Sequence, residues 1–321
     1  MTKSVLIVGC GQLGSRHLQS LAKLNELARI DLLEPVATSL QKACDLFTNS
    51  GGKKELLNLH QVPKSLQNHS FDLIIIATNS DIRPNLIKEL LGLGVKSQYW
   101  ILEKVLSQSF QLGGEIAKAL EGSKVWVNCP RRYYQCYEDI LPDVVPNTPI
   151  HMSIVGSNWG LACNAIHYLS VLNVLSRSLP TIFDTSGLDR RAPPAKRVGF
   201  VEFFGTAKAT FANGSTLTLT CTEGQEVTRV LRAEQGNKKW MVNEFQNLAE
   251  SQFEGPVQVK SIHVPTQSEL TSIIVKEIFA TGDCLLPTLA TSLAVHQPFL
   301  DGLVAFYSQI NDKNLTTVPI T

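Results

Sequence analysis

The chain has 321 residues, of which 44% are hydrophobic and 18% are charged. This is the composition of a globular protein rather than a disordered one, and the length allows two domains with separate cores. Lys and Arg number 29 against 28 Asp and Glu, so the formal net charge is +1. Because no surplus of positive charge is present to neutralise phosphates, we do not expect a nucleic-acid partner.

The sequence gives no sign of a membrane or secreted protein. Its apolar runs are shorter than the roughly 18 consecutive residues that a membrane span requires. The N-terminal apolar run ends in glycines without a signal-type cleavage site, so we expect a cytoplasmic protein with no membrane partner. Seven scattered cysteines without a Cys-x-x-Cys motif favour reduced thiols and argue against a disulfide framework or a metal site.

Short apolar runs alternate with helical patterns through the first 128 residues. Strands are predicted at residues 4–8, 30–33, 71–77, 99–102 and 125–127, and helices at 13–24, 37–47, 85–91 and 113–120. Alternation at this spacing is typical of parallel βαβ units. Residues 1–128 are therefore predicted to form a doubly wound α/β domain of the Rossmann type.

The pattern changes after about residue 130. Strands are predicted at 150–155 and 198–204, and helices at 269–280 and 289–309. Asn213-Gly214 indicates a type I′ hairpin between 207–212 and 215–221, and Gln235-Gly236-Asn237 indicates a second hairpin within 228–244. Residues 129–321 are therefore predicted to form an α+β domain with an antiparallel sheet.

A glycine motif directly follows the first predicted strand and opens a helix. The segment Gly9-Cys10-Gly11-Gln12-Leu13-Gly14 matches the pattern GxGxxG. Gly9 permits the tight turn, Gly11 lets the main chain approach a pyrophosphate, and Gly14 allows the helix to lie close to the strand. Free backbone N–H groups at the helix start favour phosphate binding. The position of the motif, more than the pattern itself, predicts a dinucleotide site.

Glu34 ends the second predicted strand, twenty residues after Gly14. A carboxylate at this position accepts hydrogen bonds from the adenosine ribose hydroxyls and repels a 2′-phosphate. The following residues, 35–37, include no Arg that could neutralise such a phosphate. We therefore predict NAD, with NADP as the less favoured cofactor; a glycine turn with an exposed Glu is the alternative without a cofactor.

Six sequence blocks carry a family resemblance. They are VGCGQLGSRH at 8–17, LLEP at 32–35, DLIIIATNSDIR at 72–83, ILEKV at 101–105, VNCPRR at 127–132 and GLACNAIHYL at 160–169. In order and spacing they resemble the Gfo/Idh/MocA oxidoreductases, the glucose-fructose oxidoreductase and inositol dehydrogenase family. The resemblance implies hydride transfer between NAD(P) and a sugar, polyol or sugar nucleotide. It also implies an open C-terminal sheet that is buried in a homodimer or homotetramer.

The resemblance assigns roles to individual residues. Lys104 matches the Lys of the family's Glu-Lys-Pro signature and is expected to polarise the reacting oxygen, whereas a strand-end Lys is otherwise usually solvated. His167 matches the family's acid/base histidine, although a lone helical His is more often structural. The expected substrate-binding residues are Lys104, Arg131, Asn164 and His167. The expected cofactor-binding residues are Gly9, Gly11, Gln12, Leu13, Gly14, Glu34, Ala77, Thr78, Asn79, Glu103 and Lys104.

The helix that carries His167 is predicted to begin after a capping side chain, Ser157 or Asn158. On this helix Cys163, His167 and Ser170 share one face, with Asn164 adjoining, which places a polar stripe in an otherwise apolar segment.

Three positions depart from the family pattern. Val105 replaces the proline after the Lys, and Arg83 stands where a histidine is common. Cys163 stands where many members carry an aspartate four residues before the histidine. A carboxylate there would stabilise an imidazolium and fix its orientation, and a neutral thiol does neither well. Either Lys104 and His167 suffice, or Asn164 takes part in substrate binding, or the hydride chemistry is weakened.

The leading hypothesis is an NAD-dependent oxidoreductase that acts on a carbohydrate-like alcohol or its ketone. The alternatives are an NAD-dependent glycoside-cleaving hydrolase and a non-catalytic NAD-binding protein. Arg131 and Arg132 either meet an anionic substrate or form a solvated hinge, and the charged segment 189–194 is interpreted as a mobile loop.

Overall fold

The computed structural model describes residues 2–321. It consists of two units, each with its own core. The first contains Met1–Ser107, Gln111–Asn128 and Pro265–Leu289, and the second contains Gln108–Phe110, Cys129–Val264 and Ala290–Thr321. The segment 265–289, which the sequence placed with the second domain, thus belongs to the first unit.

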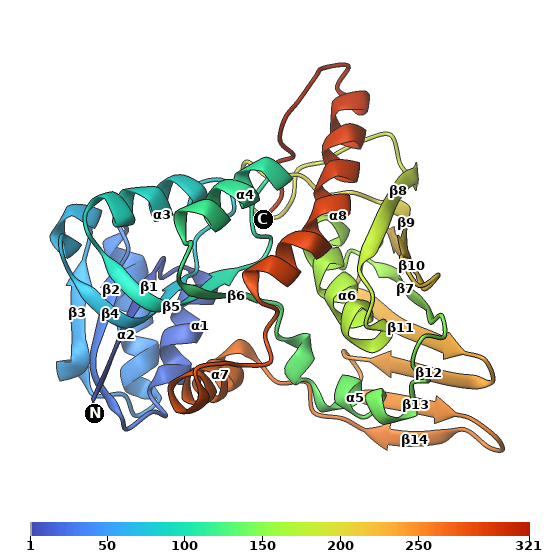
Figure 1. Ribbon diagram of the computed structural model, residues 1–321, viewed down its shortest axis with the longest axis horizontal. Coiled ribbons are helices and arrows are strands. Elements are labelled where there is room, and N and C mark those ends of the chain that lie inside the picture. Colours follow the sequence, from blue (N-terminus) through green and yellow to red (C-terminus); the bar gives the residue numbers. More distant parts are fainter. Residues whose placement is uncertain (1) are drawn as a thin grey trace. The chain divides into compact units, whose positions relative to one another are not determined.

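The first unit is built on a six-stranded parallel sheet in the order β3-β2-β1-β4-β5-β6. Helices α3 and α4 cover one face of the sheet, and α1 and α2 cover the other (Figure 1). This order and two-sided covering confirm the predicted Rossmann-type fold. The strands are β1 (Lys3–Val8), β2 (Leu27–Leu33), β3 (Leu57–His60), β4 (Ser70–Ile76), β5 (Lys96–Glu103) and β6 (Lys124–Asn128), and the helices are α1 (Gln12–Leu21), α2 (Ala37–Asn49), α3 (Arg83–Gly92) and α4 (Phe110–Ala119).

The two central strands form the core of this sheet. Residues 5–8 of β1 and 73–76 of β4 are at most 1% exposed. A parallel strand that is covered by helices on both faces must be apolar along its whole length. For this reason both strands could be predicted from their continuous apolar runs. The edge strand β3 was not predicted, because its four residues are all exposed or half-buried and show no apolar run.

Helix α7 (Gln267–Thr281) completes the first unit from far along the chain. Its start is fixed by a capping box in which Thr266 and Glu269 exchange hydrogen bonds. It packs on α1, where the Ser272 N–H donates to Ser20 Oγ over 2.8 Å. The helix itself is predictable from its pattern, but a partner about 250 residues away in sequence is not.

The second unit is built on an eight-stranded sheet in the order β14-β13-β12-β11-β7-β10-β9-β8. All neighbouring pairs are antiparallel except β7 with β10, which are parallel. The strands are β7 (His151–Ser157), β8 (Pro180–Leu188), β9 (Gly205–Phe211), β10 (Thr216–Thr222), β11 (Thr228–Gln235), β12 (Lys238–Asn243), β13 (Leu248–Gln252) and β14 (Gln258–Ser261). The helical elements are η3 (Pro130–Tyr133), α5 (Gln135–Glu138), η4 (Leu141–Asp143), α6 (Leu161–Ser176) and α8 (Leu289–Ile310).

Both predicted strand pairs are confirmed, as β9–β10 and β11–β12. The type I′ turn predicted at Asn213-Gly214 is wrong: the Gly214 N–H donates to Phe211 O at 2.9 Å, and Asn213 does not have the positive φ that a type I′ turn requires. The strand predicted at 198–204 is wrong. Residues 198 and 199 lie in the turn of a short hairpin, residues 193–202, and residues 200–202 form its return arm. Gly199 has φ +86°, and the Glu202 N–H donates to Pro193 O at 2.9 Å. The apolar pattern of 198–204 arises because Phe200, Phe203 and Phe204 are buried in the core of the unit.

Within residues 2–321, no helix combines the length and apolar character needed to cross a membrane. The seven cysteines are all free thiols. The described residues contain no cluster of three or more His, Cys, Asp or Glu side chains placed to hold a metal ion.

Candidate functional site

The glycine loop forms the bend between β1 and α1, and each of its glycines meets a different steric demand. Gly9 has φ +89°, and a Cβ there would lie 3.0 Å from Thr78 Cγ2. A Cβ on Gly14 would lie 1.8 Å from the Gly9 carbonyl oxygen, so any side chain at this position would force the helix away from the strand. A Cβ on Gly11 would meet nothing within 4 Å. Packing within the protein therefore requires Gly9 and Gly14, whereas the space beside Gly11 is open.

Helix α1 begins at Gln12 with Gly11 as its N-cap, and no side chain caps it. Its first turn, which includes Gln12, Leu13 and Gly14, contains no acidic residue. The N–H groups and the positive end of the helix dipole are thus available to an anionic group beside the open space at Gly11.

Glu34 lies directly after β2 and is bound to the glycine loop. Its Oε2 accepts a hydrogen bond from the Cys10 N–H at 2.8 Å, and its Oε1 accepts one from the Val36 N–H at 3.0 Å. The side chain is buried. Because each carboxylate oxygen has a second lone pair, both can still accept a hydrogen bond from a ligand hydroxyl.

Residues 77–79 follow β4 at the same edge of the sheet. The Ala77 N–H donates to Val8 O at 2.8 Å, which fixes this loop beside the glycine bend. The Thr78 hydroxyl is buried and has no hydrogen-bond partner among the described residues. A buried hydroxyl without a partner is uncommon, since leaving it unsatisfied costs about 1–3 kcal/mol. The open space, the anchored carboxylate and this hydroxyl together fit a dinucleotide.

Glu103 belongs to a buried polar network. His17 Nε2 lies 2.8 Å from its Oε1, and His17 Nδ1 lies 2.9 Å from Thr271 Oγ1. Asn128 Nδ2 donates to the same carboxylate oxygen and also to Gln267 Oε1 at 2.9 Å. These contacts fix the end of β5 immediately before Lys104, so the structure shows Glu103 holding its neighbour in place. His17 and Asn128 were not predicted; polar side chains on a helix face and a strand that are otherwise buried were the available signal.

The residues after Glu103 are held by Arg83. The peptide bond between Lys104 and Val105 is cis. The fully buried Arg83 guanidinium donates from Nη1 to Val105 O at 2.5 Å and to Leu106 O at 2.8 Å, and from Nη2 to Thr78 O. Burial lowers the pKa of Arg83 to about 10, with Glu103 and Asp81 opposing this effect. Arg83 thus ties the loop after β4 to the loop after β5.

Helix α6 places His167 in the second unit, with its side chain buried. The helix begins at Leu161, and its N-cap is Gly160, which has φ +77° and no side chain of its own to cap the helix. The predicted caps are therefore wrong: Ser157 Oγ donates to Glu226 O at 2.8 Å, and Asn158 Nδ2 donates to Gly224 O. Asn164 Nδ2 donates to Trp159 O at 2.7 Å and closes the bend before the helix.

Glu202, which was not predicted from the sequence, accepts a hydrogen bond from a backbone N–H in the first turn of α6. Glu202 Oε1 accepts a hydrogen bond from the Ala162 N–H at 2.7 Å and one from the Phe203 N–H at 2.9 Å. The only available sequence signal was a single charge within the apolar run 198–204.

Arg131 lies in a buried ion network. Its Nε and Nη2 donate to the two carboxylate oxygens of Glu244 at 2.7 and 2.9 Å, and Arg229 and Tyr137 donate to the same carboxylate. The Tyr168 ring lies 4.9 Å from the Arg131 guanidinium. Because Arg131 is 7% exposed and bidentate to Glu244, it has little capacity left for a substrate. Arg132 donates to Ser170 Oγ at 3.2 Å and Asn173 Oδ1 at 2.9 Å.

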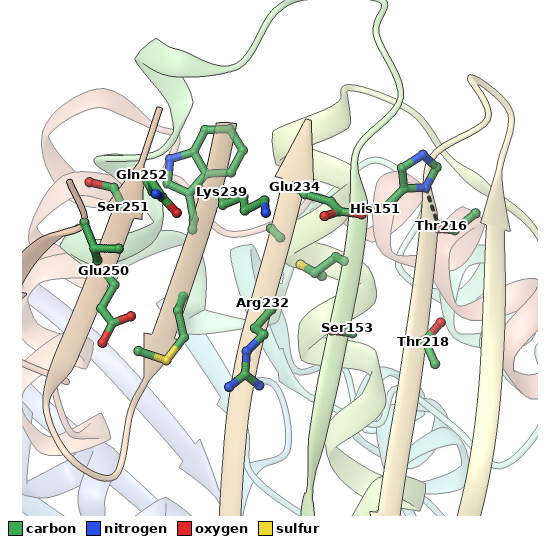
Figure 2. A pocket seen from close by; sticks show the side chains of 15 residues that line it. His151, Ser153, Thr216, Thr218, Arg232, Glu234, Lys239, Glu250, Ser251 and Gln252 are labelled. Atoms are coloured by element: carbon green, nitrogen blue, oxygen red, sulfur yellow. Dashed lines mark hydrogen bonds between the residues drawn. The ribbon is translucent and has the colours of Figure 1, made fainter. Parts of the chain in front are cut away.

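The outward face of the second sheet carries a hollow of about 490 Å³. Figure 2 shows its lining side chains projecting from the strands, with a hydrogen bond of 2.9 Å between His151 Nδ1 and Thr216 Oγ1. Charges of both signs line it, since Arg232 and Lys239 accompany Glu234 and Glu250.

No protein-family model matches the sequence, and no curated protein matches it. Among solved structures, a Gfo/Idh/MocA family oxidoreductase from Vibrio cholerae is similar with a TM-score of 0.69 and 16% identity, covering 97% of this chain and 100% of that one. This chain has the Gfo/Idh/MocA fold.

Two further similar structures have different substrates. UDP-N-acetylglucosamine 3-dehydrogenase GnnA from Acidithiobacillus ferrooxidans gives a TM-score of 0.71 at 13% identity, with 98% of each chain covered. Biliverdin reductase from Synechocystis sp. PCC 6803, in complex with biliverdin and NADP+, gives 0.71 at 15% identity, with 94% of this chain and 98% of that one covered. Proteins with a similar fold thus include a UDP-N-acetylglucosamine 3-dehydrogenase and a biliverdin reductase, so the fold alone does not identify a substrate.

Proposed function

We propose that the protein is an NAD-dependent oxidoreductase that acts on a carbohydrate-like alcohol or the corresponding ketone. The observation that carries the proposal is the buried Glu34 carboxylate bound to the Cys10 N–H, beside the open space at Gly11. On the Gfo/Idh/MocA fold, this arrangement offers main-chain amides to a pyrophosphate and an acceptor to the ribose hydroxyls next to it.

Charge at the ribose position favours NAD over NADP. A 2′-phosphate would meet the anchored Glu34 carboxylate in a buried position, where repulsion between like charges is poorly screened. Segment 35–37 contributes no cation that would offset this repulsion. Thr78 and Asn79 at the end of β4 complete the set of residues that we assign to the cofactor.

When bound, NAD supplies a hydride acceptor for oxidation of the alcohol. Oxidation removes a hydride from the substrate carbon and a proton from its oxygen. We assign Lys104 to the oxygen, where its ammonium stabilises developing negative charge. We assign His167 to the proton, which an imidazole can accept and return near neutral pH. The Glu103 network and the Arg83 hydrogen bonds support Lys104 by fixing the backbone on either side of it.

The test is steady-state turnover on a panel of polyols, sugars and sugar nucleotides, followed by the absorbance of reduced nicotinamide. We expect at least one substrate to be oxidised by the wild type. Lys104→Met and His167→Asn should each lower kcat by about 100-fold or more, with dinucleotide affinity retained. Sugar release without net NADH would instead indicate the glycoside-cleaving hydrolase. Dinucleotide binding without turnover of any substrate would indicate a non-catalytic protein.

A second copy of the chain is the partner that we propose for the outward face of the second sheet. Arg232 and Lys239 on this face are matched by Glu234 and Glu250, so two copies related by a two-fold axis can pair opposite charges. The exposed Val155 on the same face adds apolar area at the centre.

A further inference from the structure

We propose that Glu202 is a positioning residue that supplies, from the hairpin 193–202, the carboxylate that orients the His167 imidazole and stabilises its protonated form. This inference rests on the proposed function for its catalytic meaning, but its physical content, a coupling between Glu202 and His167, can be measured without turnover.

The first observation is that Glu202 is rigidly placed at the start of α6. Its own N–H donates to Pro193 O at 2.9 Å, and the neighbouring Val201 N–H donates to Pro319 O at 2.9 Å. Its carboxylate accepts the Ala162 N–H at 2.7 Å in the first turn of the helix. The positive end of the helix dipole favours negative charge at this position.

The second observation is the crowding of polar atoms around Gly160. A Cβ at this position would lie 2.9 Å from Asn164 Nδ2, 3.1 Å from Cys163 Sγ and 3.4 Å from Glu202 Oε2. The carboxylate, the thiol and the amide therefore surround one point. The absence of a side chain at Gly160 is what lets them converge there.

Helix geometry connects this point to His167. Cys163 and His167 are four residues apart and thus lie on the same face, one turn from each other. Side chains on a helix lean toward its N-terminus, so the His167 ring extends back toward Cys163 and Glu202. Cys163 itself is a neutral thiol that accompanies this face, and its Sγ donates to Gly160 O at 3.5 Å. The charge that a helical aspartate would bring at position 163 arrives from Glu202 instead.

The charged groups around α6 come from several elements. Those packed against the helix include β10 and η3, and Arg229 of β11, which is paired with Glu244, lies 5.6 Å from the centroid of the Tyr168 ring. On β10 the titratable group is Cys221, whose thiol pKa is raised by burial and further by the charge of Glu202. On η3 the charged groups are Arg131, which is neutralised by Glu244, and Arg132, which donates to Ser170 on α6.

The experiment compares four proteins: wild type, Glu202→Gln, Cys163→Asp/Glu202→Gln, and Glu223→Gln as a matched control. Glu202→Gln keeps an acceptor for the Ala162 N–H and removes only the charge. Glu223 is an exposed carboxylate in the same unit that pairs with Arg191. The His167 resonances are followed by NMR titration without cofactor or substrate, with His167→Asn used for assignment, and the pH dependence of kcat is measured where turnover exists.

We expect Glu202→Gln to lower the apparent pKa of His167 by about one pH unit, because an opposite charge near an imidazole favours the protonated form. The acid limb of the pH–rate profile for alcohol oxidation should shift to lower pH by the same amount as the His167 pKa. In addition, kcat should fall by on the order of 10-fold with little change in KM. In the double variant, Cys163→Asp should restore both the His167 pKa and kcat. Glu223→Gln should match the wild type in both.

An unchanged His167 titration in Glu202→Gln would overturn the inference, even if that variant loses stability or activity, because a purely structural role predicts that result. Failure of the double variant to restore the titration would also overturn it. A shifted and restored titration in a protein that turns over no substrate supports the coupling and contradicts only the proposed enzymatic function.

Discussion

Replacement of Glu244 by Gln should remove a large part of the stability of the second unit. Burial alone would raise the pKa of Glu244, but the charges and hydrogen bonds of Arg131 and Arg229, with a further hydrogen bond from Tyr137, outweigh it and lower the pKa to about 2 from 4.5. At about 1.4 kcal/mol per pH unit, this depression corresponds to roughly 3 kcal/mol of folding free energy at pH 7. Loss of the charge also leaves two buried guanidinium groups without their counterion, which costs roughly 3–5 kcal/mol in comparable cases.

The sign of the pH dependence follows from the depressed pKa. The contribution of Glu244 is fully present above pH 4.5, its unfolded-state value, and is lost as the pH falls toward 2. Urea unfolding followed by circular dichroism should therefore show Glu244→Gln well below the wild type at pH 7, with the gap narrowing at acid pH. Glu254→Gln, at an exposed position, is the control. A gap under about 1 kcal/mol at pH 7, or one that does not change with pH, would refute this reasoning.

Four further substitutions test the glycine loop, the Arg83 hydrogen bonds and the outward face of the second sheet. Gly11→Ala should fold with the stability of the wild type, within about 0.5 kcal/mol, yet bind dinucleotide at least about 10-fold more weakly in a fluorescence titration. Gly14→Ala should lose stability as well, by roughly 1–3 kcal/mol in thermal unfolding, because its Cβ meets the Gly9 carbonyl; equal effects of the two variants would contradict the assigned roles. Arg83→Met should cost roughly 3 kcal/mol or more, since three buried carbonyl oxygens lose their donor, and wild-type stability would count against that role. Ser153→Arg should convert the proposed oligomer to a monomer in light scattering, and an unchanged mass would exclude this face as the interface.

The Rossmann-type unit was predictable because its signals are local. An apolar strand, three glycines and an acid at the end of the next strand lie within 34 residues, and parallel pairing brings Gly9 and Glu34 to the same sheet edge. The positions of the two hairpin turns were predictable for the same reason, since φ is positive at Gly214 and Gly236, although the first turn is not of the predicted type I′.

Contacts between distant segments were not predictable from one sequence. Helix α7 joins the first unit through hydrogen bonds of Thr271 to His17 and of Ser272 to Ser20. No local sequence pattern predicts these contacts. The strand prediction at 198–204 was wrong because three buried aromatic residues give this segment the apolar pattern of a strand, although it does not form the hydrogen-bond ladder of one. Because the segment was interpreted as a strand, Glu202 was not considered as a residue that contacts α6.

The candidate site shows the same division. The positions of Lys104 and His167 came from a family resemblance, while the residues that hold their surroundings came only from the structure. Arg131 illustrates the difference. The resemblance predicts that it contacts substrate, and only the structure shows that it is paired with Glu244, more than 110 residues later.

The most direct test of the central claim is calorimetric titration of the purified chain with NADH and NADPH, in the wild type and in Glu34→Ala. We expect one NADH per chain, a preference of at least about 10-fold over NADPH in the wild type, and loss of that preference in the variant. If neither dinucleotide binds, or if NADPH binds the wild type more tightly, the assignment of the glycine loop and Glu34 to an NAD site is contradicted.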